Sequence, residues 1–317
     1  MLKKIKNRAR QGASFIKRDE PALLTFLFHS IFRNEAEIAQ KHIDPQQFIT
    51  LAIYREFLEY FLAAGYSFIS PDDLVRGLDS DGRYILATFD DGYFNNQHVV
   101  PLLQEYKCPA LFYIASHNVQ NNECFWWDVV YRELSKQGLE RKAISVAQKE
   151  YKKLSHPEIL TRLKEEFGET VLQPCSDIDR PFTPDELRDF AAQEYVYIGN
   201  HTSHHYILDN YGSDIQHEQM LGCQQALQQM LTITPETVSY PNGNYNADTL
   251  RVASELGFEY GVTVDKRKNY LPIREEDKLS LGRFVIWGKM PLKMQCDIFR
   301  SDMRKSARKK VSKGEML

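Results

Sequence analysis

Acidic side chains directly follow one of the apolar runs of this sequence. Asp90 and Asp91 come after the run at residues 84–89, and Gly92 behind them allows the backbone to turn sharply. Adjacent carboxylates repel each other unless a cation or a proton lies between them, so this pair is a candidate for metal binding or proton transfer. Taken alone, an Asp-Asp-Gly segment is more often a solvated turn, and the interpretation needs a second signal.

Imidazole side chains supply that signal after another apolar run, at residues 195–198. Residues 199–205 read Gly-Asn-His-Thr-Ser-His-His, and His201 and His205 can converge on one side of a short loop or helical turn. Two neutral imidazoles, a carboxylate and an open position make a hydrolytic site for zinc or a similar divalent ion. A lone histidine is more often a hydrogen-bonded loop residue, but two at this spacing, together with the Asp pair, favour the metal site.

Apolar runs alternate with amphipathic segments along most of the chain. We expect strands at residues 22–29, 84–89, 110–115, 195–198, 237–240, 260–264 and 283–286. We expect helices at residues 45–65, 92–106, 184–193, 213–231, 246–256 and 291–303. This alternation predicts an α/β fold with parallel strands, in which about seven units form a (β/α) barrel. The Asp pair and the histidines then follow the carboxyl ends of strands, where such folds place their active sites.

A mostly polar, helical segment at residues 118–182 interrupts this alternation. We interpret it as a helical insertion in a barrel that spans residues 21–300, with basic segments at residues 1–20 and 301–317. Trp126 and Trp127, near the start of the insertion, could stack on sugar rings as a lid or could anchor the insertion to the barrel.

The two motifs, Thr-Phe-Asp-Asp-Gly-Tyr and Gly-Asn-His-Thr-Ser-His-His, together resemble the polysaccharide deacetylase superfamily, carbohydrate esterase family four. The first two motifs of that family read TFDDG and H-[ST]-x-x-H, in this order and about this far apart. The resemblance extends from about Leu24 to Trp287. It implies a distorted, incomplete (β/α) barrel and the hydrolysis of an N-acetyl, sometimes an O-acetyl, group on a sugar.

The resemblance also implies roles for individual residues. Asp91, His201 and His205 would bind a divalent metal, with zinc as the first choice and cobalt, nickel or manganese as alternatives. Asp90 would be the general base that takes a proton from water, and Tyr93 would contact the substrate or the oxyanion. The chemistry is consistent, because a divalent cation polarises a carbonyl and acidifies water while Asp90 only has to accept a proton.

The third motif of the family, Arg-x-Pro-Tyr, is altered here to Ser-Tyr-Pro-Asn-Gly at residues 239–243. Ser239 cannot supply the arginine charge that positions the catalytic aspartate. Asn242 replaces the tyrosine, although its backbone N–H can still stabilise the oxyanion. Arg283 could restore the missing charge or bind an anionic group of the substrate, and a surface ion pair is the commoner role of such a residue.

The fifth motif, Leu-x-His, supplies the general acid in the family and is not recognisable here, because residues 281–286 contain no histidine. His29 follows the first expected strand and is a candidate for this role. A buried or capping histidine is the equal alternative. The residue that protonates the departing amine is therefore open.

The composition of the chain indicates the cellular compartment in which we expect the protein. No stretch reaches the roughly 18–20 uninterrupted apolar residues that a membrane span needs, and we find no secretory signal. Five cysteines without a CxxC pair exclude a disulfide framework and a thiolate zinc site, which favours a reducing, cytoplasmic location.

Charge is distributed unevenly along the chain. Residues 1–18 and 300–317 carry seven Lys/Arg each, which leaves 26 basic and 41 acidic residues between them and a net charge of −15 there. An acidic body argues against nucleic acid as a partner. The basic ends could contact an anionic membrane at its inner face or remain as solvated termini. The sequence does not indicate an oligomeric state.

These observations predict a metal-dependent hydrolase that removes an N-acetyl group from a sugar. We expect the substrate to be a precursor of a surface polysaccharide, either nucleotide-linked, lipid-linked or an oligosaccharide. Because the third and fifth motifs are altered, two alternatives remain. One is an O-acyl or non-sugar amide hydrolase on the same scaffold, and the other is a non-catalytic carbohydrate-binding protein.

Overall fold

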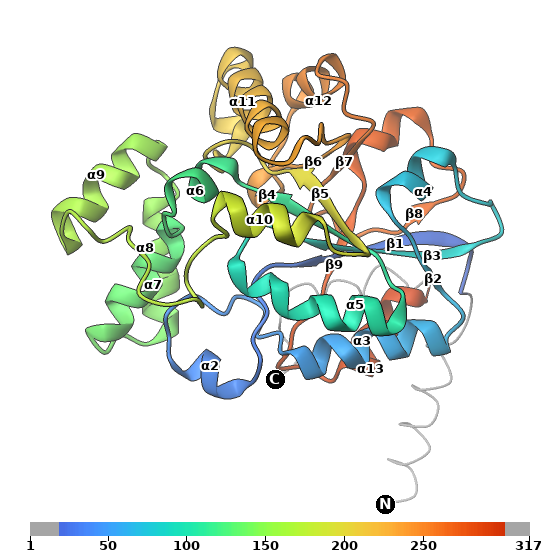
Figure 1. Cartoon of the computed structure of the whole chain (residues 1–317), viewed down its shortest axis with the longest axis horizontal. Coiled ribbons are helices and arrows are strands. Elements are labelled where there is room, and N and C mark those ends of the chain that lie inside the picture. Colours follow the sequence, from blue (N-terminus) through green and yellow to red (C-terminus); the bar gives the residue numbers. More distant parts are fainter. Residues whose placement is uncertain (1–18, 302–317) are drawn as a thin grey trace, which may run out of the picture.

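A curled sheet of mostly parallel strands forms the centre of the molecule. The computed structural model describes residues 19–301 (Figure 1). The sheet has the order β7-β6-β5-β4-β3-β1-β8, with β9 also paired to β1 and β2 to β3. Its parallel strands are β1 (Ala22–Phe28), β2 (Ser67–Phe68), β3 (Arg83–Phe89), β4 (Ala110–Ile114), β5 (Val196–Asn200), β6 (Thr237–Ser239), β7 (Tyr260–Val262) and β9 (Arg283–Val285). The short β8 (Asn269–Tyr270) is antiparallel to β1.

The sheet nearly closes into a barrel. On one side β9 pairs with β1. On the other side β7 reaches only the segment that leads into β9, through an isolated bridge between Val262 and Leu281. Within the described residues, the strands β1, β3, β4, β5, β6, β7 and β9 complete the curl. The predicted distorted, incomplete (β/α) barrel of about seven units is therefore confirmed.

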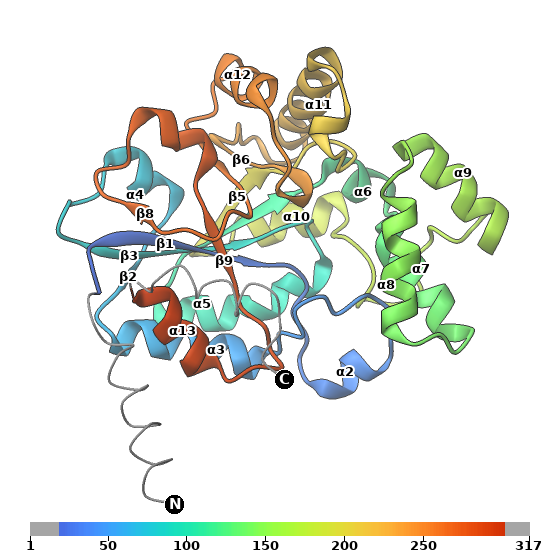
Figure 2. The same ribbon diagram turned by 180° about the vertical axis from the view of Figure 1, so that it is seen from behind.

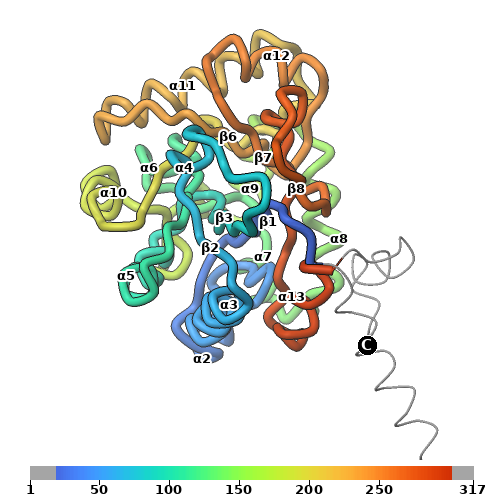
Figure 3. The backbone as a smooth tube through the Cα atoms, turned by 90° about the vertical axis from the view of Figure 1, so that its right-hand side faces the viewer, coloured from blue at the N-terminus to red at the C-terminus, as the bar shows by residue number. Residues whose placement is uncertain are grey.

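Helices cover the outer face of this curl, and Figure 3 shows them arranged around the strands. They are α3 (Leu51–Ala63), α4 (Pro71–Arg76), α5 (Val100–Tyr106), α6 (Ser116–Asn121), α10 (Pro184–Ala191), α11 (Ser213–Leu231), α12 (Ala247–Glu255) and α13 (Leu292–Arg300). The short α2 (Glu35–Ala39) lies in the loop after β1 and has no buried residue. The 3-10 turns are η1 (Phe94–Val99), η2 (Leu208–Asn210), η3 (Pro241–Gly243) and η4 (Glu275–Ser280). The helix expected at residues 45–65 begins only with α3, because Gln46 and Phe48 adopt the left-handed region at φ values of 42° and 59°.

Strand alternation gives β1 and β3 an apolar outer face and an inner face that mixes leucines with polar residues. Phe26, Phe28 and Phe89 belong to the main core on the outer side, where the ring centroids of Phe28 and Phe89 lie 5.2 Å apart. Thr25 and Thr88 alternate with them and are fully buried on the inner side. Asp90 continues the inner register of β3, so its side chain faces the barrel interior.

The helices α7 (Trp126–Lys136), α8 (Arg141–Tyr151) and α9 (His156–Phe167) occupy the segment predicted as an insertion. They lie together at one end of the barrel (Figure 1, Figure 2). Their buried apolar cluster consists of Cys124, Trp126, Val129, Val130, Tyr151, Ile159, Leu163, Val171 and Leu172. A buried ion pair between Arg132 Nη1 and Asp179 Oδ2, 2.5 Å long, ties α7 to the segment that returns to the barrel. The insertion therefore has a small core of its own.

The two ends of the described chain lie side by side. Arg300 Nη2 and Asp19 Oδ2 are 2.8 Å apart, and Asp19 also accepts a hydrogen bond from Arg83 Nη1 at 3.1 Å. Since Arg83 begins β3, this contact lies at the amino-terminal ends of the strands. The predicted basic segments at residues 1–20 and 301–317 fall almost entirely outside the described residues. No helix within residues 19–301 is long and apolar enough to cross a membrane.

Candidate metal centre

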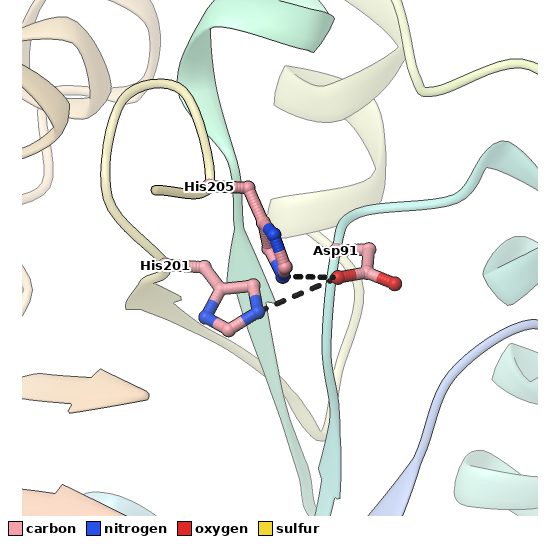
Figure 4. A group of neighbouring side chains, drawn as sticks. All are labelled: Asp91, His201 and His205. Carbon is pink, nitrogen blue, oxygen red and sulfur yellow. Dashed lines mark ion pairs between the residues drawn. The ribbon is translucent and has the colours of Figure 1, made fainter. Parts of the chain in front are cut away.

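The three predicted ligands converge at the carboxyl ends of β3 and β5. Asp91 follows β3, whereas His201 and His205 belong to the loop after β5. Oδ1 of Asp91 lies 3.4 Å from Nε2 of each histidine (Figure 4). The ligand atoms all lie within 4.8 Å of one another, and residues 19–301 contain no other group of this kind.

Uncommon backbone conformations direct these side chains toward each other. Asp91 and Gly92 have φ values of 80° and 91°, which turn the chain sharply after β3. Residues with a Cβ rarely adopt this region, and strain of this kind persists where the surrounding structure holds a functional side chain in place. Thr202 and His205, at φ values of 65° and 55°, curl the histidine loop in the same way.

A hydrogen bond fixes the ring of His201. Its Nδ1 lies 2.8 Å from the backbone carbonyl oxygen of Ser239, so Nδ1 carries the proton and donates. In the neutral ring, Nε2 then has the free lone pair, and Nε2 is the nitrogen that faces Asp91. Backbone carbonyl groups commonly orient metal-binding histidines in this way.

The donor set fits a divalent metal ion. Both carboxylate oxygens of Asp91 are buried and have no hydrogen-bond donor among the described residues, which is costly for a charged group. Burial and the neighbouring His201 lower the pKa of His205 to about 3, so its ring is neutral, as metal ligation requires. One carboxylate and two imidazoles leave coordination positions for water and substrate.

A bidentate ion pair holds Asp90 beside these ligands. Nη1 and Nη2 of Arg283 donate to Oδ1 and Oδ2 of Asp90, both at 2.8 Å, and Ser239 Oγ donates to Oδ2 at 3.0 Å. Burial alone would raise the pKa of Asp90, but the charge of Arg283, together with that of His201 when its ring is protonated, outweighs burial and holds that pKa well below its usual range. Asp90 is therefore ionised and fixed in orientation.

Arg283 thus supplies the charge that the altered third motif lacks. It begins β9, and its side chain crosses the barrel interior to reach Thr88 and Asp90 near the end of β3. The residue is fully buried, and it does not line the cavity beside the metal centre. The prediction that Arg283 binds an anionic group of the substrate is therefore wrong, and so is the alternative of a surface ion pair.

A cavity of about 300 Å³ opens beside the metal centre. The predicted site residues that line it are Asp90, Asp91, His201, His205, His29, Asn242, Trp126 and Trp127. All predicted site residues except Tyr93 and Arg283 therefore line this cavity, and Arg283 joins the site through its ion pair with Asp90.

His29 lies at this cavity, directly after β1. Its Nδ1 is 2.9 Å from Oε1 of Gln47. Nε2 of Gln47 donates to the carbonyl oxygens of Leu27 and Ile286, which identifies Oε1 as the acceptor for His29. Nδ1 of His29 is therefore protonated, and Nε2 is the nitrogen that can exchange a proton with a substrate.

Asn242 lines the same cavity. It adopts the left-handed region at φ 58°, and its backbone N–H makes no hydrogen bond with the described residues. Its side chain is engaged, because Oδ1 accepts a hydrogen bond from Nζ of Lys152 at 2.8 Å. An unpaired N–H at this position is suited to a developing oxyanion.

Tyr93 does not line the cavity, and the prediction that it contacts the substrate or the oxyanion is wrong. Its buried hydroxyl donates to Oδ2 of Asp128 at 2.5 Å and accepts a hydrogen bond from Nε1 of Trp127 at 3.0 Å. The ring of Trp127 in turn packs against His205, with centroids 4.6 Å apart. Tyr93 therefore supports the cavity wall from behind.

The two tryptophans both line the cavity, and both also hold the insertion in place. Trp126 is 7% exposed and stacks on Tyr151 within the cluster of the insertion. Trp127 stacks on Phe125 and contacts the ligand His205. The packing therefore supports the anchoring role, and stacking on a sugar ring as a lid stays a prediction for these two cavity-lining side chains.

Sequence reasoning missed several cavity residues and one support of the catalytic pair. The missed cavity residues include Asp44, Gln148, Lys152, His156, Tyr206 and Tyr211. Gln148, Lys152 and His156 join the site only when the insertion folds over the strand ends, and no local motif marks them. Asp44, Tyr206 and Tyr211 belong to the loops after β1 and β5, and their place after strand ends was the available signal. Ser239 serves Asp90 through its hydroxyl and His201 through its carbonyl, and its place at the end of an expected strand was the available signal.

An incomplete (β/α) barrel with a candidate metal centre and a fixed carboxylate at its strand ends defines a hydrolase-like site. The family model for polysaccharide deacetylase matches residues 77–261, and the chain therefore belongs to the polysaccharide deacetylase family. YxkH of Bacillus subtilis (strain 168), a curated relative that carries the same family name, is 21% identical over 268 residues. The match covers 82% of this chain and 71% of YxkH.

Solved structures share the fold. The deacetylase PplD of Streptococcus pyogenes, in complex with acetate, matches 88% of this chain and 99% of its own, at a TM-score of 0.59 and 18% identity. IcaB from Ammonifex degensii matches 88% of this chain and 97% of its own, at a TM-score of 0.55 and 16% identity.

Proposed function

We propose that the protein is a metal-dependent N-deacetylase that removes the acetyl group from an amino sugar. Membership in the polysaccharide deacetylase family supports hydrolysis of acetyl groups on sugars as the reaction class. The observation that carries the metal dependence is the convergence of Asp91, His201 and His205 next to Asp90 in one cavity. Two imidazoles and a carboxylate suit zinc first, with cobalt, nickel and manganese as alternatives.

The residues of the site divide the work of amide hydrolysis. When bound, the cation would polarise the acetyl carbonyl and lower the pKa of water. Asp90, kept ionised and aligned by Arg283, accepts a proton from the attacking water. The backbone N–H of Asn242 donates to the acetyl oxygen as negative charge develops there. His29 gives a proton to the nitrogen as the C–N bond breaks, which yields acetate and a free amine.

We also propose a setting for this reaction. The substrate is a nucleotide-linked, lipid-linked or oligosaccharide precursor of a surface polysaccharide, and the protein acts in the cytoplasm at the inner face of the membrane. The five cysteines, all unpaired, support a reducing compartment. The basic ends of the chain support contact with anionic lipid, and their nearest described residues, Asp19 and Arg300, touch each other.

The test begins with bound metal. We would measure metal content by elemental analysis on the wild type and on a His201→Ala/His205→Ala variant, both purified without chelators or a polyhistidine tag. We expect about one divalent ion per chain in the wild type and none in a variant that is still folded. Acetate release from N-acetyl and O-acetyl sugars would then identify the bond. A wild type that stays empty after incubation with zinc, cobalt, nickel and manganese would contradict the proposal.

A further inference from the structure

Helix α8 lies across the opening between two walls of the barrel. Gln148 and Lys152 are one turn apart and therefore share a face of this helix region. Nε2 of Gln148 donates to Oδ2 of Asp44 at 3.2 Å, and Asp44 belongs to the loop after β1. Nζ of Lys152 donates to Oδ1 of Asn242 at 2.8 Å, and Asn242 belongs to η3 after β6. Since β3, β4 and β5 separate β1 from β6 in the sheet, one helical turn joins opposite sides of the site.

We call the two contacts, Gln148 with Asp44 and Lys152 with Asn242, the crossing. Further contacts strengthen both of its ends. On the β1 side, Nη2 of Arg141 donates to Oδ1 of Asp44 at 2.7 Å and to the carbonyl oxygen of Gln46 at 3.3 Å. On the other side, the backbone N–H of His156 donates to the hydroxyl of Tyr211 at 3.2 Å. The turn from α8 into α9 is thus fastened to the loops after β5 and β6.

The space enclosed by these contacts is small. Its volume of about 300 Å³ is at the lower end of the ~300–1,000 Å³ that small-molecule sites occupy. Asp44, Gln148, Lys152 and Asn242, which make the crossing, all line it. A sugar inside a polymer has a neighbour on each side, and its chain would have to leave the cavity in two directions. The contacts at Asp44 and Asn242 narrow two opposite sides, and the one between Lys152 and Asn242 lies at the exposed rim of the cavity.

We propose that the site accepts an amino sugar at the end of a chain, or a single sugar on a small carrier, and excludes sugars within a polymer. This inference rests on the proposed deacetylation and specifies its substrate class. Lys152 and Asn242 are then the residues that close the cavity against a continuing glycan chain.

The test uses a hexasaccharide of N-acetylglucosamine labelled at its reducing end. After incubation with metal-loaded protein, tandem mass spectrometry locates each free amine along the chain. We expect the wild type to remove one acetyl group per chain, from a terminal sugar. Free amines at internal positions in early product would overturn the inference.

A matched pair of variants distinguishes the effect of the contact between Lys152 and Asn242 from the general effect of removing a positive charge. Lys152→Ala removes the contact with Asn242, whereas Lys153→Ala removes an equally exposed neighbour whose ion pair, within residues 19–301, is with Glu150 of α8. We expect Lys152→Ala to raise the ratio of internal to terminal deacetylation several-fold and Lys153→Ala to leave it unchanged. Equal ratios in the two variants would contradict the role of Lys152.

Failure of the proposed function gives a different result. If metal-loaded protein releases no acetate from any acetylated sugar, the proposed deacetylation is wrong. The affinities of the protein for the monosaccharide and the hexasaccharide, measured by calorimetry, then test whether the site accepts only a terminal sugar. Similar affinities per chain would support a site for one terminal sugar. A hexasaccharide that binds many-fold more tightly, or the absence of binding by either sugar, would overturn it.

Discussion

The contribution of the Arg283–Asp90 ion pair to the stability of the protein can be measured separately from activity. Their side chains are only 1% and 5% exposed. Removing one partner of a buried pair leaves the other charge uncompensated, which costs about 3–5 kcal/mol. We expect Arg283→Met to lower the free energy of unfolding by about this amount, and Arg283→Met/Asp90→Asn to recover part of the loss because the stranded charge is gone. Urea denaturation of the single and double variants measures both effects.

The same variants connect the pair to catalysis. Arg283→Lys keeps a positive charge but lacks the two-pronged geometry, so we expect stability between the wild type and Arg283→Met. Asp90→Asn should lower kcat/KM by about 10²–10⁴-fold, as loss of a general base does. If Arg283→Met unfolds at the wild-type urea concentration, the ion pair does not hold Asp90 in the way that we describe.

The convergence of the candidate ligands could be predicted from the sequence, because it depends on local motifs at strand ends. Asp91, His201 and His205 meet because each follows a strand end, and the carboxyl ends of parallel strands share one edge of the fold. The partner of Asp90 was not assigned in this way. Arg283 reaches Asp90 only because β9 pairs with β1 and closes the curl, which is a long-range contact without a local signal. Tyr93 was misassigned because its adjacency to the motif gives no information on which way its ring points.

At the level of elements, the insertion depends on a buried carboxylate. Asp179 accepts hydrogen bonds from Arg132 and from the backbone N–H groups of Cys175 and Ser176. Burial would raise the pKa of Asp179, but the hydrogen bonds from Cys175 and Ser176 and the charge of Arg132 lower it below its usual 3.8. The stabilisation is therefore fully present above about pH 4 and is lost as the pH falls through the lowered pKa.

We expect Asp179→Asn to lower the free energy of unfolding by about 3–5 kcal/mol near neutral pH, because Arg132 is left without its counter-charge. The difference from the wild type should shrink at pH values below about 3.8, where the wild-type Asp179 itself becomes protonated. Urea titrations followed by tryptophan fluorescence from about pH 7 to about pH 3 measure this. Asp177→Asn, whose partner Arg180 lies on the same surface turn, is the control and should change stability by less than about 0.5 kcal/mol. A pH-independent difference for Asp179→Asn would contradict the assignment.

The elements themselves were largely predictable, but not their placement over the site. The helix expected at residues 213–231 coincides with α11, because its boundaries follow helical periodicity. The segment at residues 118–182 was expected to be helical, and α7, α8 and α9 lie in it. That α8 crosses the site, however, depends on the contacts of Gln148 and Lys152 with Asp44 and Asn242. Each partner lies about 90 or more residues away in sequence, and nothing near either residue indicates the contact.

For the molecule as a whole, the two edges of the barrel have separate roles. The metal centre and the cavity lie at the carboxyl ends of the strands. The described chain ends meet at the opposite edge, where Asp19 contacts Arg83 and Arg300. A strand of seven residues such as β3 separates these edges by about 23 Å. The described chain ends are therefore separated from the cavity by the length of the strands.

We predict that a variant lacking residues 1–18 and 302–317 loses binding to vesicles that contain anionic phospholipid. Each Lys or Arg near such a surface contributes about 1 kcal/mol, and the wild-type interaction should weaken as salt shortens the screening length to about 10 Å at 0.1 M. Vesicle co-sedimentation at low and high salt measures this, and a full-length variant with glutamine at the basic positions of both ends is the matched control for length. Because the cavity lies at the other edge, kcat/KM on a water-soluble acetylated sugar should be unchanged. Equal sedimentation of the wild type and both variants would remove the membrane contact from the proposal and leave the active site untouched.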